Sequence, residues 1–192
     1  MVNGVKIPTI ETCLQLMDDY RMLDNIKAHS RVVARVAELI TVGLRQRSGA
    51  GLNLDLVISA SLLHDIAKTL CLDNHCDHAR VGGEICRKHG FVELADIVEE
   101  HVVIKSNSSV LITEKEIVYY ADKRVNHDQV VSLQDRLDYI LDRYGRNNAV
   151  RYDLIQQNFA KCLNMEKRIF ASLDFSPEQL AYQIMAKQDW RV

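Results

Sequence analysis

The residues best suited to chemistry in this chain are an adjacent histidine and aspartate, His64 and Asp65. They interrupt an apolar run, Ser61-Leu62-Leu63-His64-Asp65-Ile66-Ala67-Lys68, which indicates a buried helix. An imidazole and a carboxylate are strong metal ligands, and their burial requires hydrogen-bonding partners or a bound cation. Ordinary hydrogen bonds would explain the pair if it stood alone.

Further potential ligands lie on both sides of this pair, each on or beside a stretch with helical periodicity. They are His29, His78, His101 and Asp122. With His64 and Asp65 they make six imidazole and carboxylate groups on separate helices. Such a set indicates one metal centre.

A cation belongs to the same motif. In a helix, Lys68 lies four residues after His64 and three after Asp65, so all three side chains lean toward one side. The spacing therefore predicts a lysine amine beside the metal. The alternative is a lysine on a solvated helix surface.

The order of these residues resembles that of the HD superfamily of metal-dependent phosphohydrolases, from about Asp24 to Asp128. Three segments are similar to the family's central motif, its His-then-Gly element and its closing aspartate: Leu62-Leu63-His64-Asp65-Ile66-Ala67-Lys68, His78-Ala79-Arg80-Val81-Gly82 and Tyr120-Ala121-Asp122-Lys123. Some relatives carry a His-His pair where this chain has His101-Val102. That departure argues against a third metal ion and against a cyclic-dinucleotide phosphodiesterase.

The resemblance implies a binuclear centre. One divalent ion would be held, with open positions left for water, by His29, His64, Asp65 and Asp122. His78 and His101 would hold a second ion, and Asp65 would bridge the two because a carboxylate has two oxygens. Histidine-rich ligation suits iron, manganese, zinc, cobalt or nickel.

The implied reaction is hydrolysis of a phosphate ester of a small, nucleotide-like substrate by a metal-activated water. Asp65 and Lys68 would be catalytic. Lys68, Lys123 and Arg124 would bind the substrate, since phosphoryl oxygens gain stabilisation from nearby cations. A solvated helix surface is the alternative role for each of these three residues. Arg136, Arg143 and Arg151 more simply form a solvated basic face.

Two other function classes fit the same residues. Members of the superfamily with a similar six-ligand pattern are di-iron oxygenases, and ligand type alone does not separate iron from manganese or zinc. A non-catalytic ligand-binding or signalling module would normally have lost a ligand, whereas this chain has all six.

A rival zinc site lies between Cys71 and His78, where Cys71, His75, Cys76 and His78 are zinc-competent. C-x-x-C spacing is missing, so a loop ending at His78 is favoured. Five cysteines without a secretory signal indicate reduced thiols rather than a disulfide framework. The remaining histidines are predicted at the surface or at helix ends: His75, His89 and His127.

The elements that must position these residues are nearly all helices. The sequence predicts an all-α single domain of about eight or nine helices, and the resemblance implies that this domain is of the HD type. Starts are indicated at Pro8-Thr9, Asp24, Asn53, Asp77, Glu93, Thr113, Ser132, Tyr152 and Ser176-Pro177. The Asn53 helix would carry His64 and Asp65, Asp24 would cap a long helix bearing His29, and the helix from Glu93 to Ile104 would carry His101.

Length and composition favour one domain over residues 1–192, with a metal-binding core at 24–128 and supporting helices at 129–192. Those helices could be support, a lid wall or a homodimer surface. A net charge of −2 argues against a nucleic-acid polymer as partner. Residues 1–6 lack an apolar signal core and no run could span a bilayer, so we expect a cytoplasmic protein without a membrane partner.

Overall fold

The computed structural model describes residues 6–105, 111–146 and 148–186. Nine α-helices account for most of them: α1 (Ile10–Asp19), α2 (Asp24–Ser48), α3 (Leu54–Leu63), α4 (His78–Lys88), α5 (Val92–Glu99), α6 (Glu114–Lys123), α7 (Leu133–Ile140), α8 (Ala149–Phe170) and α9 (Leu180–Ala186). A small hairpin and three short helical turns complete the order: β1 (Val125–Asn126), β2 (Gln129–Val130), η1 (Thr69–Cys71), η2 (Leu141–Gly145) and η3 (Pro177–Gln179). The predicted all-α class is confirmed.

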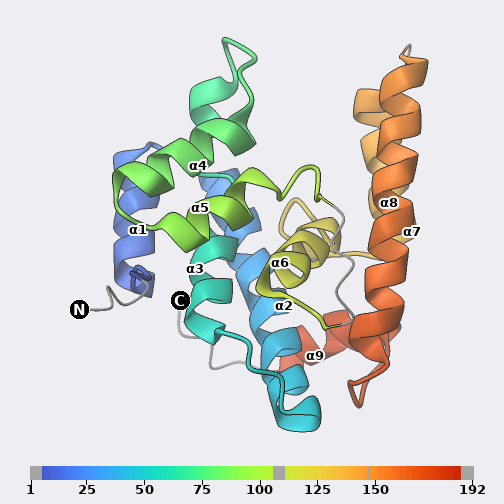
Figure 1. The fold of residues 1–192 in the computed structure, drawn as a ribbon. Helices are drawn as coiled ribbons and strands as arrows, with labels where there is room; N and C mark the ends of the chain where they lie inside the picture. Colours follow the sequence, from blue (N-terminus) through green and yellow to red (C-terminus); the bar gives the residue numbers. More distant parts are fainter. Residues whose placement is uncertain (1–5, 106–110, 147, 187–192) are drawn as a thin grey trace.

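Helix α3 lies at the centre of the molecule, between α2, α5 and α6 (Figure 1). All its residues from Val57 to Leu63 are buried, as expected for a helix that is apolar on every side. The 25-residue α2 runs past it and turns one stripe of small and apolar residues inward. Because α3 is enclosed by its neighbours, the polar residues at its end are enclosed too.

Helix starts agree with the capping residues in the sequence. Asn53, Asp77, Thr113 and Ser132 each accept a backbone N–H of the following helix. Thr113 and Ser132 form complete capping boxes. Two predicted starts were wrong in detail. Asp24 is the first residue of α2, whose N-cap is Leu23, and α8 begins at Ala149 after the cap Asn148 rather than at Tyr152.

Two helix ends come earlier than predicted, and both lie at proposed ligands. Helix α3 ends at Leu63, so His64 is its C-cap and Asp65 lies in the following turn. Helix α5 ends at Glu99 rather than Ile104, which puts His101 in the bend beyond it. In both cases the histidine Nδ1 donates to the carbonyl three residues earlier, Ser61 O or Val98 O.

The C-terminal helices pack against the core from one side. Helix α8 stands along the edge of the molecule with α7 beside it, and α9 packs against α2 (Figure 1). Between α7 and α8, residues Leu141–Gly145 form a π-helical turn. Partly buried contacts join this part to the core, including the bond from Arg35 to the Ile184 carbonyl and the ion pair of Arg124 with Glu166.

The cysteines correct one prediction. Cys71 and Cys76 form a disulfide, so these two are not reduced thiols, and their sulfurs do not form the rival zinc site. Cys13, Cys86 and Cys162 are free and buried. Burial raises the pKa of each of these three thiols to about 12. A thiol with such a pKa stays protonated and unreactive at neutral pH.

Among the described residues, no helix has both the length and the apolar character needed to cross a membrane. Most of the predicted signal-free N-terminus, residues 1–5, lies outside the described part of the chain.

Candidate metal centre

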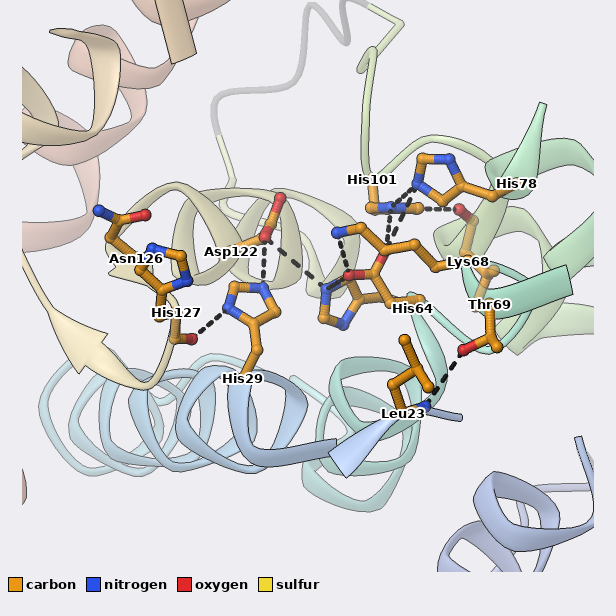
Figure 2. A network of polar contacts seen from close by, with 12 residues as sticks. Leu23, His29, His64, Lys68, Thr69, His78, His101, Asp122, Asn126 and His127 are labelled. Carbon is orange, nitrogen blue, oxygen red and sulfur yellow. Dashed lines mark hydrogen bonds and ion pairs between the residues drawn. The ribbon is translucent and has the colours of Figure 1, made fainter. Parts of the chain in front are cut away.

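The structure brings all six proposed ligands together. Figure 2 shows five of them in one cluster, His29, His64, His78, His101 and Asp122, and ion-pair distances put Asp65 among them. Helix α2 contributes His29, and α6 contributes Asp122. The other four come from element ends and bends: His64, Asp65, His78 and His101. All six are buried except His78, whose side chain is 26% exposed. The convergence that the sequence predicted is therefore present, and metal binding by these residues stays a prediction.

One half of the cluster joins α2, α3 and α6. His29 Nε2 lies 3.0 Å from Asp122 Oδ1, and His64 Nε2 lies 3.7 Å from the same oxygen. The nearest ligand atoms of these three residues all lie within 4.8 Å of one another. Two imidazoles and a carboxylate at this spacing could hold one ion, with positions left for water.

The other half is arranged around Asp65. Its Oδ1 lies 3.3 Å from both His78 Nε2 and His101 Nε2, which are 3.2 Å apart. Its Oδ2 lies 3.5 Å from His64 Nε2. Because the two oxygens face different imidazoles, the position of Asp65 suits a carboxylate shared by two ions.

Backbone carbonyls set the orientation of three imidazoles. The Nδ1 atoms of His29, His64 and His101 donate to carbonyls at 2.7–2.8 Å, those of His127, Ser61 and Val98 respectively. With Nδ1 as the donor, each Nε2 points into the cluster as a potential ligand. The His127 ring is exposed, as predicted. The role of its carbonyl was not visible in the sequence, because every residue has one.

Two buried atoms of the cluster, His64 Nε2 and Asp65 Oδ1, have no hydrogen-bond partner among the described residues. Buried polar atoms without a partner are rare in folded proteins. A histidine nitrogen and a carboxylate oxygen are both good ligands for divalent transition metals. The residues present therefore fit a metal ion.

The electrostatics of the cluster also favour a cation. Burial opposes charge on His64, but the Asp65 and Asp122 carboxylates outweigh it and raise the His64 pKa. Burial would raise the pKa of Asp65, yet His64 and Lys68 hold that pKa well below its usual range. Burial lowers the pKa of His101 to about 4. At neutral pH Asp65 is thus ionised and His101 neutral, the forms in which they bind a metal.

Lys68 lies where the sequence predicted. Its Nζ is 2.7 Å from Asp65 Oδ2, and 38% of its side chain is exposed. The amine therefore stands at the rim of the cluster, in contact with a proposed ligand and open to a molecule arriving from solvent.

Lys123 and Arg124 are both buried, so a solvated surface role is excluded for them. Lys123 Nζ lies 2.6 Å from Asp122 Oδ2 and donates to the His101 carbonyl at 3.0 Å. The lysine amine therefore fixes the orientation of the Asp122 carboxylate and is itself shielded from solvent.

The guanidinium of Arg124 is engaged elsewhere. It donates to four protein groups: the Tyr120 hydroxyl, the Glu166 carboxylate and the carbonyls of Val131 and Pro177. These contacts link α6 to the C-terminal helices. Its predicted role as a substrate ligand gains no support from this placement.

With the geometry established, comparison with known proteins identifies the family. The HD domain model matches residues 26–140, and the chain belongs to this family. The resemblance seen in the sequence is confirmed.

Among curated proteins the chain is similar to Ribonuclease Y of Opitutus terrae, 26% identical over 178 residues, and of Mycoplasma mycoides, 29% identical over 109 residues. These alignments cover 89% and 56% of this chain but 31% and 24% of the relatives. The chain thus spans less than a third of their length. Among solved structures it is similar to a predicted HD superfamily hydrolase from an uncultured Thermotogales bacterium, at 19% identity and a TM-score of 0.46, with 86% of this chain and 94% of that chain covered.

Proposed function

We propose that this protein is a metal-dependent phosphohydrolase that cleaves a phosphate ester of a small, nucleotide-like molecule. The observation that carries the proposal is the six-ligand cluster, in which the two oxygens of Asp65 face different imidazoles. Membership of the HD domain family supports a hydrolase.

The six proposed ligands would form two metal sites that share Asp65. Four of them would hold one ion: His29, His64, Asp65 and Asp122. His78 and His101 would complete the site of a second, shared through Asp65. When bound, one or two such ions would supply a Lewis acid and a water of lowered pKa.

The amine of Lys68 would bind an oxygen of the phosphoryl group, because it is the cluster's partly exposed cation. Its contact with the proposed bridging carboxylate of Asp65 supports this role. Lys123 would orient Asp122 without touching the substrate, since it is buried behind that carboxylate.

A second candidate substrate is RNA. The curated relatives are named Ribonuclease Y, and hydrolysis of a phosphodiester would use the same cluster. The chain's formal net charge of −2 favours a small substrate over a long polyanion. A cytoplasmic location remains the sequence-based prediction.

The test is phosphate release from a panel of nucleoside monophosphates, cyclic nucleotides, dinucleotides, sugar phosphates and a short RNA. Metal-free protein is reconstituted separately with manganese, nickel, cobalt, zinc or iron, and each is assayed in air and under strict anaerobiosis. Hydrolysis requires no change of oxidation state. We therefore expect turnover of a small phosphate ester without oxygen, with an ion other than iron.

Two variants make the test specific. His64→Ala should abolish turnover, and His75→Ala, which removes an exposed histidine outside the cluster, should leave it unchanged. Activity found only with iron and oxygen would overturn the proposal in favour of an oxygenase. Cleavage of RNA and of no small ester would show that the substrate class is wrong, while the assignment as a metal-dependent hydrolase would stand.

A further inference from the structure

A row of aromatic and basic side chains runs along η2 and α7 beside the metal centre. The ring of Tyr139 contacts the ring of His127 edge-on, with centroids 5.4 Å apart. Arg143 donates to the Tyr144 hydroxyl at 3.1 Å and to the Tyr139 hydroxyl at 3.4 Å. Arg136 lies over the Tyr139 ring. These contacts join the side chains into one continuous surface.

One end of the row joins the cluster through the hairpin. The His127 carbonyl accepts a hydrogen bond from His29 Nδ1, and Asn126 and His127 lie next to His29 and Asp122 (Figure 2). Arg136 donates to the Asn126 side chain at 2.9 Å, which ties α7 to the same hairpin.

Arg143 carries the row outward to Tyr144. It donates to the hydroxyls of both Tyr139 and Tyr144. Tyr139 in turn contacts the ring of His127, the residue whose carbonyl orients His29. The row therefore runs from the His29 side of the cluster out to Tyr144.

Packing does not explain the two outermost members. Tyr144 is 47% exposed and Arg143 is exposed. Both lie in the π-helical turn Leu141–Gly145, and π-helical turns occur frequently at functional sites. An exposed tyrosine and arginine beside a phosphate site match the chemistry that binds a planar aromatic ring, through stacking and cation–π contact.

We propose that Tyr144, with Arg143 and Tyr139 behind it, binds the nucleobase of a nucleoside monophosphate whose phosphate lies at the metal centre. The inference rests on the proposed function and goes further, since it names the base-binding residues and selects nucleotides over sugar phosphates. It also gives the helices after residue 129 a direct role in the site.

The experiment compares a nucleoside monophosphate with ribose 5-phosphate, which presents a similar phosphate ester without a base. In wild type, kcat/KM should favour the nucleotide by about tenfold or more, in line with the contribution of one stacked base. Tyr144→Ala should lower kcat/KM for the nucleotide roughly fivefold to a hundredfold, mainly through KM, and leave ribose 5-phosphate unchanged. Tyr144→Phe should retain most of the preference because its ring can still stack.

Tyr182→Ala, which removes an exposed tyrosine of α9, is the matched control and should change neither substrate. A readout independent of turnover is saturation-transfer NMR of the nucleotide with metal-free protein. The base protons should receive saturation from wild type and from Tyr144→Phe but not from Tyr144→Ala.

Equal losses on both substrates in Tyr144→Ala, or no preference in wild type, would overturn the inference while the proposed function stands. If wild type hydrolyses no phosphate ester of the panel used to test the proposed function, the proposed function fails, and the NMR result alone decides about base binding. A Tyr144→Ala protein that changes from dimer to monomer while still preferring the nucleotide would assign Tyr144 to a contact between copies and overturn the inference.

Discussion

Asp65 connects the two halves of the candidate metal centre through its two carboxylate oxygens. Oδ1 faces His78 and His101, whereas Oδ2 faces His64 and the amine of Lys68. A carboxylate in this position is held ionised by its neighbours and does not need a proton to remain buried. Its replacement should therefore affect both halves, whereas loss of one imidazole should affect one.

We predict that Asp65→Ala loses both metal ions and that His101→Ala loses mainly one. The reason is geometric, because His101 Nε2 lies 3.3 Å from Asp65 Oδ1 and 3.2 Å from His78 Nε2, the groups proposed for the second ion. Metal content per chain, measured by elemental analysis after reconstitution and dialysis, checks the prediction. Full stoichiometry in Asp65→Ala would rule out a bridging carboxylate.

For Lys68 we predict a loss of rate without a loss of metal. Lys68→Ala should lower kcat by roughly tenfold to a thousandfold, as expected when one charge-stabilising donor is removed. Metal content should stay at the wild-type level because the amine is no ligand. Lys88→Ala, a change of an exposed lysine at the end of α4, should leave kcat unchanged. Wild-type turnover in Lys68→Ala would show that Lys68 is a solvated surface lysine with no role in catalysis.

The sequence predicted which residues would meet, since their types, order and helical context were all visible in it. It did not predict what holds them in place. The carbonyl of His127 orients His29, and the carbonyl of His101 receives Lys123. Every residue has a carbonyl, so residue type carries no signal for such contacts. The burial of Arg124 was missed for a related reason, because its partners Glu166 and Pro177 lie far along the chain.

At the scale of elements, most helix starts were predictable and two helix ends were not. Caps such as Asn53 and Thr113 act within three residues, so the local sequence contains the information. The ends of α3 and α5 depend on histidine side chains. His64 and His101 donate from Nδ1 to the carbonyls of Ser61 and Val98, which a longer helix would use for its own backbone bonds. The apolar periodicity of the sequence continues beyond Leu63 and Glu99, so the sequence predicted that both helices would end later than they do.

The position of His78 depends on how closely α4 approaches α5. Gly82 lies one turn after His78, and a Cβ at Gly82 would stand 2.9 Å from the buried Val98 side chain and 3.5 Å from Ile66. The absence of a side chain at this point allows the two helices to pack closely. This gives a physical reason for a glycine after the histidine.

We predict that Gly82→Ala destabilises the protein by about 1–2 kcal/mol, because overpacking outweighs the gain in helix propensity. Urea unfolding measures the change. Gly83→Ala is the matched control, since its Cβ would meet the side chain of Glu99, which can move toward solvent. We expect a smaller cost there. Equal stability of Gly82→Ala and wild type would show that the α4–α5 contact adapts without strain.

At the scale of the whole molecule, the proposed metal site joins parts of the chain that are far apart in sequence. His29 on α2 and Asp122 on α6 are 93 residues apart and share the first group of ligands with His64. An ion bound there links α2, α3 and α6 in the folded state only. Ligand binding to the folded state raises its stability by mass action, even when no other contact changes.

Metal binding should therefore raise the melting temperature of the protein. At a free metal concentration of 100 to 1,000 times Kd, binding contributes roughly 3–4 kcal/mol. For a domain of this size that corresponds to an increase in Tm of about 5–15 °C. Calorimetry of metal-free protein with and without manganese measures it. His29→Ala should lose most of the increase, because one ligand of the α2–α3–α6 group is gone, whereas His75→Ala should keep it. An unchanged Tm in wild type, or the same increase in His29→Ala, would show that no metal ion joins these three helices.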